Sequence, residues 1–321
     1  MLRRKRVKPK TQQLYTTLAV EFLQKYHLNE TSPAHMIDRW LDTELDSLYL
    51  LGHNAGPGRT LYYALRWFLS LANAALPLAS QARQGHARAE KPSLQPPESS
   101  EAALLMAHSL VTNTDARFLP KEQLAAAIAI LLSFDLYGHA SDLPRAAATE
   151  LRGPAAHQTG PAACWTLTLF PQTAEVQSKT RTTDETLAIG TANPRRQWLQ
   201  RLAPHLHRLP QAQGLLLGLE TARYNVLFKQ ARVWAHLWAS SPHRLRHGGA
   251  SADALLDGAA KRTDLDIASR GRWQSLTSVR RYRQPAMYLR ELARLSPKQL
   301  DQAMAAEALL PLLLVRLLKA K

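Results

Sequence analysis

The stretch His243-Arg244-Leu245-Arg246-His247-Gly248-Gly249-Ala250-Ser251 decides how the second half of this chain folds. It follows Ser241-Pro242, and a proline in the first turn after a capping residue is typical of a helix start. On such a helix His243 and Arg246 are three residues apart, so their side chains leave from one face. A single His-x-x-Arg pair is also common on solvated helices. Its meaning therefore depends on the residues downstream of it.

Downstream, Gly271-Arg272-Trp273 precedes Tyr282 in the run Ser278-Val279-Arg280-Arg281-Tyr282-Arg283. Three arginines around one tyrosine create a positive potential. That potential favours the phenolate form of a group whose ordinary pKa is about 10, and it attracts a phosphodiester. A surface tyrosine on a basic helix is the alternative interpretation.

Upstream, two short strands are predicted at residues 165–170 and 185–189, around the polar turn at residues 177–181. Lys179 lies at the tip of this hairpin, where it is either solvated or able to deliver a proton into a groove. Cys164 is the single cysteine of the chain. A lone cysteine excludes an internal disulfide and a thiolate zinc cluster, so we expect a buried strand residue there.

The charge of the chain points to a polyanionic partner. Lys and Arg total 41 against 25 Asp and Glu, which gives a net charge of +16 over 321 residues. Each phosphate that a basic side chain neutralises releases counterions, but charge alone does not separate DNA, RNA and an anionic membrane. No apolar run is long enough to span a bilayer. The basic residues 3–6 lack a following apolar core, so they indicate a DNA-contacting or nuclear-import arm or a solvated tail, and a nuclear or cytoplasmic location.

Hydrophobic periodicity divides the chain into two domains. Residues 1–80 show helical spacing, residues 81–100 have the Pro- and Ser-rich composition of a linker, and residues 101–321 form the larger domain. Further helices are predicted at residues 102–111, 121–134, 195–201 and 221–238, and from residue 243 to the C-terminus. The expected fold class is mainly α, with one small β-hairpin in the second domain.

Taken together, the pattern from residue 133 to 295 resembles the tyrosine recombinase (phage integrase) family. The residues that carry the resemblance are the predicted helix Ser133–Leu143, Lys179, His243, Arg246, Gly271-Arg272-Trp273 and Tyr282. The pattern is similar to eukaryotic, mobile-element-like members, and residues 1–80 resemble the family's core-binding, DNA-binding domain. With DNA as the partner, Gly248-Gly249 would let a DNA strand or another backbone approach closely.

The resemblance implies strand cleavage without a metal ion or nucleotide cofactor. Tyr282 would attack a scissile phosphate and form a 3′-phosphotyrosyl link. Arg246 would bind the non-bridging oxygens, His243 would accept the tyrosine proton or bond the phosphate, Trp273 would pack against the site, and Lys179 would protonate the leaving 5′-oxygen. Further DNA contacts are expected from a set of arginines around these motifs: Arg280, Arg281, Arg283, Arg272 and Arg244.

One position departs from the family pattern. Where the resemblance implies an arginine, three residues before Asp142, this chain has His139. Loss of one donor to the developing charge costs about a hundred- to a thousand-fold in rate. A protonated His139 could replace part of this contribution. The chain is therefore a slow enzyme, an enzyme assisted by His139, or a degenerate copy that still binds DNA.

Several other interpretations stay open. A non-catalytic DNA-binding protein or a type IB topoisomerase-like nicking enzyme would share the fold, whereas an RNA-binding or structural helical protein would share only the charge. A metal site at His243 and His247, with His205 and His207 upstream, lacks an acidic partner or thiol. The resemblance also implies self-association on double-stranded DNA as a dimer or tetramer. The C-terminal helix from residue 297 would then dock on its own domain or on a neighbouring protomer.

Overall fold

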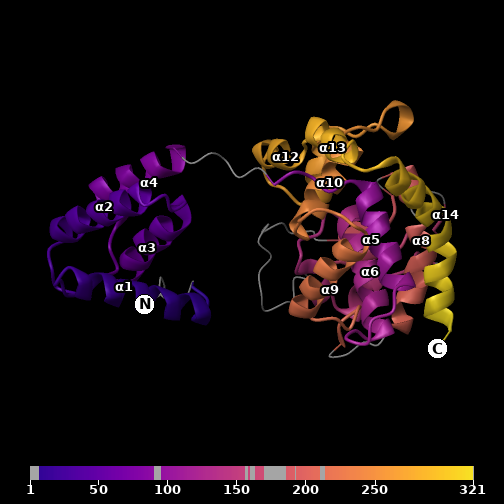
Figure 1. The fold of residues 1–321 in the computed structure, drawn as a ribbon, viewed down its shortest axis with the longest axis horizontal. Helices are drawn as coiled ribbons and strands as arrows, with labels where there is room; N and C mark the ends of the chain where they lie inside the picture. The colour runs from indigo at the N-terminus through magenta and orange to yellow at the C-terminus, as the bar shows by residue number, and fades with distance from the viewer. Residues whose placement is uncertain are drawn as a thin grey trace. The chain divides into compact units, whose positions relative to one another are not determined.

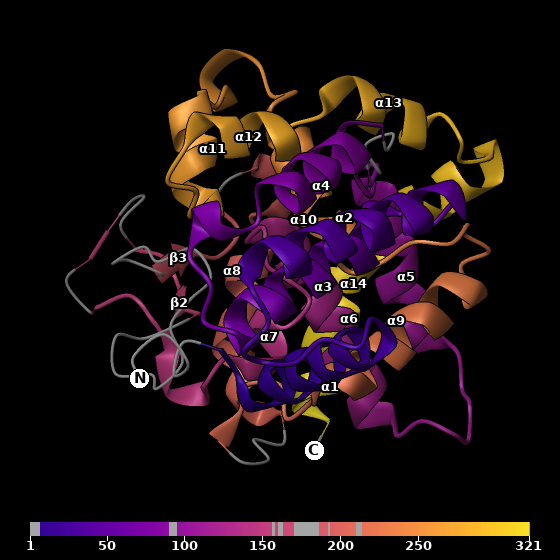
Figure 2. The same cartoon turned by 90° about the vertical axis from the view of Figure 1, so that its left-hand side faces the viewer.

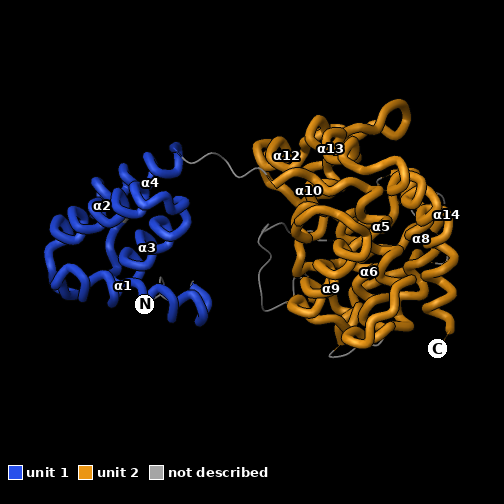
Figure 3. The backbone as a smooth tube through the Cα atoms, in the orientation of Figure 1, with its two compact units in different colours: residues 1–94 blue, residues 95–321 orange. Residues whose placement is uncertain are grey.

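The computed structural model describes residues 7–89, 95–155, 158–159, 163–169, 186–191, 193–209 and 214–320. The chain forms two compact units, residues 1–94 and residues 95–321 (Figure 3). The predicted fold class, mainly α with a small antiparallel sheet, is confirmed. Among the described residues, no helix combines the length and apolar character that a membrane span requires.

The first unit is a bundle of short amphipathic helices (Figure 1). Phe22, Leu41, Leu45 and Leu65 lie in its core and are almost fully buried. These residues recur at helical spacing, which is why each helix buries one face. The helices are α1 (Pro9–Lys25), α2 (Ala34–Leu50), α3 (Ala55–Phe68) and α4 (Pro77–Ala89), with a 3-10 turn at Asn73–Ala75.

Helix α4 occupies a segment that we expected to be partly linker. Residues 81–89 belong to this helix rather than to the tether. Pro77 is its first residue, a position that tolerates proline because the missing N–H would have no partner there. The buried carboxylate of Asp38 accepts the next N–H groups, from Leu78 at 3.0 Å and Ala79 at 2.9 Å. Pro77, which adds to the linker-like composition of this stretch, is thus the first residue of a helix.

The core of the second unit is built around α5 (Ser100–Thr112) and α6 (Pro120–Asp135), which lie side by side in Figures 1 and 2. From Gln123 to Asp135 every residue of α6 is buried. A helix that is apolar on all sides must be covered on all sides. Helices α5 and α9 (Thr221–Trp234) supply part of this cover, and α9 and α14 (Pro297–Lys319) also pack on α5.

Shorter elements complete the second unit. They are the helices α7 (Asp142–Arg145), α8 (Leu199–Leu202), α10 (His243–Asp253), α11 (Asp264–Gly271), α12 (Leu276–Tyr282) and α13 (Pro285–Leu292), and the 3-10 turns Ala148–Glu150, Pro194–Arg196, Ala203–Arg208 and Gly258–Ala260. The predicted helix at residues 195–201 is thus divided into a 3-10 turn and α8. The helix predicted to reach residue 238 ends at Trp234, because His236 adopts a left-handed backbone conformation (φ 52°).

Among the described residues the second unit contains an antiparallel sheet in the order β1-β2-β3. Strands β2 (Thr166–Thr168) and β3 (Thr186–Ala188) confirm the two predicted strands, with Leu167 opposite Leu187. Strand β1 (Leu151–Arg152) was not expected. Cys164 precedes β2 and is only half-buried, so the prediction of a buried strand residue was wrong. Lys179 lies outside the described residues.

Helix α14 docks on its own unit. Ala303, Ala306, Leu310 and Leu314 are fully buried along one face, against α5 and the 3-10 turn Ala203–Arg208. The Ser296 hydroxyl accepts the N–H of Gln299, and the Gln299 side chain accepts the N–H of Ser296, so the start of the helix is fixed. Of the two expected docking modes, this structure shows the one within the domain.

Candidate active site

Helix α10 carries the motif that decided the sequence interpretation, and two glycines seat it deep in the second unit. A Cβ at Gly248 would overlap the carbonyl oxygen of Glu98, and a Cβ at Gly249 would overlap the carbonyl oxygen of Phe134. We expected these glycines to let a DNA strand or another backbone approach closely. In this structure, backbone segments of the protein itself approach both glycines. As a result, the side chain of Arg246 lies inside the domain rather than on its surface.

Arg246 is 1% exposed and is held by two backbone carbonyls. It donates to the carbonyl of Tyr137, just past the end of α6, and to the carbonyl of Gly271, the last residue of α11, at 2.6 Å. Carbonyls at helix C-termini lack helical partners and carry partial negative charge, so they suit a buried cation. The Nε atom of Arg246 has no hydrogen-bond partner among the described residues.

Tyr282, the last residue of α12, lies against this arginine. Its ring centroid is 5.2 Å from the Arg246 guanidinium carbon. Its ring is parallel to that of Trp273, with centroids 4.7 Å apart and an interplanar angle of 14°. Ser251 of α10 donates to the Tyr282 carbonyl at 3.2 Å and accepts the N–H of Gln284 at 2.9 Å, which ties α10 to the end of α12.

Two histidine rings lie beside the phenol, and a third histidine ring stacks on one of them. The His243 ring is 5.7 Å from the Tyr282 ring and stacks on His139 at 5.4 Å. The His247 ring is nearer to the Tyr282 ring, at 4.5 Å, although the sequence suggested it only as a metal ligand and not as a neighbour of the tyrosine. Its position four residues after His243 was the available signal, because that spacing returns to the same helix face. The described residues contain no group of three or more ligands placed to hold a metal ion.

Burial lowers the pKa of His247 to about 3, and the nearby His243, Arg246 and Arg244 act in the same direction. His247 is therefore neutral at physiological pH in this structure. Burial also lowers the pKa of Arg246, and the neighbouring Arg272 guanidinium lowers it further, while Asp142 and Tyr282 oppose the shift. The site thus holds like charges close together at low solvent exposure.

Arg272, one of the expected DNA contacts, is 3% exposed and faces the interior of the site rather than the protein surface. It donates to Asp142 Oδ2 at 3.0 Å, and the same oxygen accepts the backbone N–H of His139 at 2.8 Å. The helix predicted for residues 133–143 is not continuous. Helix α6 ends at Asp135, left-handed Tyr137 (φ 48°) reverses the chain, and α7 begins at Asp142.

Arg244 is also not the surface DNA contact that we expected. It is 4% exposed and donates to Glu291 of α13 at 2.6 Å and to the carbonyl of Pro96 at 2.7 Å. It therefore fastens residues 95–98 and α13 to α10. Arg280 and Arg281 are exposed on α12, and exposed Arg283 pairs with Asp264 at 3.1 Å.

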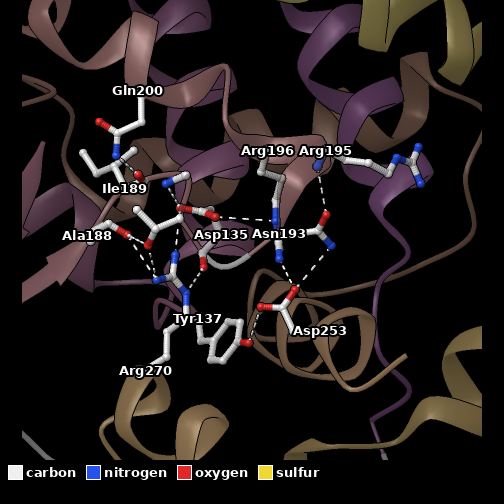
Figure 4. Close-up of polar contacts among 12 residues, drawn as sticks. Asp135, Tyr137, Ala188, Ile189, Asn193, Arg195, Arg196, Gln200, Asp253 and Arg270 are labelled. Atoms are coloured by element: carbon white, nitrogen blue, oxygen red, sulfur yellow. Dashed lines mark hydrogen bonds and ion pairs between the residues drawn. The ribbon is translucent and has the colours of Figure 1, made fainter. Parts of the chain in front are cut away.

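A buried polar network joins the ends of α6, α10 and α11 (Figure 4). Tyr137 donates to Asp253 at 2.5 Å, and Asp253 also pairs with Arg196. Arg270 of α11 bonds Asp135 at 3.0 Å and the carbonyl of Ala188 at 3.1 Å, so the base of β3 is tied to the ends of α6 and α11. The network fixes the two helix ends whose carbonyls hold Arg246.

The chain shares its fold with lambda integrase. A lambda integrase dimer bound to a COC′ core site is 15% identical to it with a TM-score of 0.55, and the match covers 87% of this chain and 90% of that one. A lambda integrase tetramer bound to a Holliday junction is 13% identical with a TM-score of 0.53, covering 87% and 73%. No protein-family model and no curated protein sequence matches the chain. The likeness establishes an integrase-type fold, with the described cluster in its second unit.

Proposed function

We propose that this chain is a DNA strand transferase of the tyrosine recombinase type, with Tyr282 as its covalent nucleophile. One observation carries the proposal: the Tyr282 ring lies 5.2 Å from the buried guanidinium of Arg246, within one cluster that includes Trp273 and His243. Arg246 and Tyr282 belong to different helices, α10 and α12, and their contact supports a shared role. The integrase-type fold supports the same conclusion.

The proposed reaction is a phosphoryl transfer that conserves the number of bonds. The Tyr282 oxygen attacks the scissile phosphorus, the bond from phosphorus to the 5′-oxygen breaks, and a 3′-phosphotyrosyl bond replaces it. The phenol proton passes to His243, and the departing 5′-oxygen takes a proton, which we assign to Lys179 from the sequence pattern. A 5′-hydroxyl from a second strand reverses the step. The phosphotyrosyl link keeps the energy of the broken phosphodiester, so no nucleotide cofactor is needed.

Arg246 supplies electrostatic stabilisation in this scheme. Both of its observed partners are neutral carbonyls, and it forms no ion pair with a described residue. Its charge is therefore available to a phosphate, which a charge-assisted hydrogen bond would hold more strongly than a neutral one. Trp273 packs on the phenol and fixes its plane.

DNA is the proposed partner because the net charge is +16 and Arg280 and Arg281 are exposed on the helix that ends at Tyr282. The lambda integrase structures contain DNA-bound dimers and tetramers. We propose the same kind of self-association here, with the first unit as an additional DNA-binding domain. The resemblance to eukaryotic mobile-element members stays a prediction from the sequence.

A covalent-adduct assay tests the proposal without knowledge of the target sequence. The wild-type protein is incubated with a pool of nicked duplexes of randomised sequence, and SDS-resistant protein–DNA adducts are recovered. We expect an adduct with the wild-type protein and none with Tyr282→Phe. No adduct from the wild-type protein would contradict the proposed activity.

A degenerate DNA-binding protein is the second candidate, and His139 is the observation that favours it. If the wild-type protein binds DNA without forming an adduct, and His139→Arg forms one, the chain is a degenerate copy. An adduct formed by both proteins, faster with His139→Arg, identifies a slow enzyme. Relaxation of supercoiled DNA without strand exchange would instead identify a topoisomerase-like activity.

A further inference from the structure

The sequence supplies one arginine to the proposed phosphate site, but the fold brings a second one beside it. We infer that Arg272 binds the scissile phosphate together with Arg246, and so replaces the guanidinium that is missing at position 139. The inference rests on the proposed function, since it names a further residue of the same site. The backbone conformation, burial and charge of Arg272 support it.

The backbone places Arg272 in the interior. Arg272 ends α11 in a left-handed conformation (φ 57°, ψ 39°), which disfavours any residue with a Cβ and usually selects glycine. This turn directs the side chain toward Asp142, while Trp273 folds back over Gly271, where a Cβ would overlap the indole. Unfavourable backbone conformations on large side chains concentrate at functional sites.

Arg246 donates to the carbonyl of Gly271, the residue directly before Arg272, so the two arginines meet at the end of α11. The two residues are 1% and 3% exposed, and the Arg272 charge lowers the pKa of Arg246. Two buried like charges repel each other, so an anion in contact with both would relieve the repulsion. A phosphodiester offers two non-bridging oxygens, one for each guanidinium.

Asp142 acts as the positioning group. Its Oδ2 atom accepts from Arg272 and from the backbone N–H of His139, so it links the arginine to the chain segment that contains position 139. Through Asp142, the guanidinium of Arg272 is therefore linked to the backbone of residue 139. The imidazole of His139 instead stacks on His243.

The first test measures inorganic phosphate binding by titration calorimetry and needs no DNA. The variant is Arg272→Gln/Asp142→Asn, which removes both partners because a single change would leave a buried charge unpaired. The control is Arg290→Gln, an exposed arginine on α13. We expect the dissociation constant of the double variant to rise at least tenfold and that of the control to stay unchanged. An unchanged constant in the double variant, or no phosphate binding by the wild-type protein, overturns the inference.

The second test separates phosphate binding from a purely structural role. A duplex recovered from the randomised pool is resynthesised with a neutral methylphosphonate at the linked position. On the phosphodiester the double variant should form adduct about a hundredfold more slowly than the wild-type protein. On the methylphosphonate, the double variant should form adduct less than tenfold more slowly than the wild-type protein. An equal deficit on both substrates overturns the inference, whereas a wild-type protein without any adduct refutes the proposed function and leaves the phosphate titration to decide on Arg272.

Discussion

The indole of Trp273 lies nearly parallel to the phenol of Tyr282, with ring centroids 4.7 Å apart, and the Tyr137 ring also stacks on the indole at 6.1 Å. The Arg246 guanidinium carbon is 4.8 Å from the indole and 5.2 Å from the phenol. The orientation of the candidate nucleophile thus depends on a neighbour that does not itself react.

Removing the indole should therefore slow cleavage without abolishing it. An aromatic pair contributes about 0.5–1.5 kcal/mol beyond its buried area, so Trp273→Ala should reduce adduct formation by about two- to tenfold. Trp273→Phe keeps a stacking ring and should fall between Trp273→Ala and the wild-type protein. Equal rates for all three proteins would show that the stack has no part in orienting Tyr282.

Gly271 should not tolerate a methyl group. A Cβ there would overlap the Trp273 ring, so Gly271→Ala must displace the indole, at a cost of about 1–3 kcal/mol of stability in addition to a slower adduct reaction. Gly85→Ala is the matched control, because Gly85 is helical and a Cβ there meets nothing within 4 Å. Thermal unfolding and the adduct assay together check the prediction. An active, fully stable Gly271→Ala protein would contradict the described packing.

Acid should destabilise the second unit through His247. Its pKa is about 3 in the folded chain against 6.5 for an ordinary histidine, so between these values only the unfolded chain binds the proton. The free energy of unfolding therefore decreases as the pH falls below about 6.5, and this one group accounts for about 2 kcal/mol by pH 5. His247→Gln should lose correspondingly less stability between pH 7.5 and pH 5, as measured by urea denaturation without DNA. Parallel pH profiles for the two proteins would refute the assignment.

The buried carboxylate of Asp253 should be essential for folding. Asp253→Asn leaves the buried Arg196 without its nearest charge partner, and breaking one side of such a pair costs about 3–5 kcal/mol. Asp115→Asn is the matched control, because the Asp115–Arg117 pair is exposed and solvent screens it. Urea denaturation compares the two variants. A similar small effect from both would show that the network of Figure 4 adds no stability.

DNA affinity should depend on salt through α12. Arg280→Gln/Arg281→Gln should lower the slope of log K against log salt concentration by about 0.9 for each phosphate that the variant no longer neutralises. Binding is measured on Tyr282→Phe protein, so that cleavage does not interfere, and Arg290→Gln serves as the control. A slope near zero in the protein with both arginines intact would argue against nucleic-acid binding altogether.

The sequence located the part of the site that depends on local periodicity. His243 and Arg246 share a helix face, and the nine-residue interval from Trp273 to Tyr282 brings the two rings together once α11 and α12 pack. Arg244 was misassigned because nothing near it in sequence shows that Glu291, 47 residues later, takes up its charge. The interior position of Arg272 could not be predicted, because it depends on a left-handed backbone conformation in which glycine is the usual residue. Residues 81–89 were assigned to a linker because they are polar and stand between Pro77 and the prolines of residues 92–97, a composition that hides the helix starting at Pro77.

Arg246 is attached to two carbonyls, one just past the end of α6 and one at the end of α11, and this attachment has a consequence for how the protein can diverge. A substitution at Arg246 would leave both oxygens buried and unsatisfied, so the domain would lose stability along with any chemistry. Residue 139 is half-buried and contributes a backbone N–H that any residue except proline provides. Sequence drift at this centre is therefore asymmetric: position 139 can change while the protein stays folded, whereas position 246 is constrained by the architecture itself.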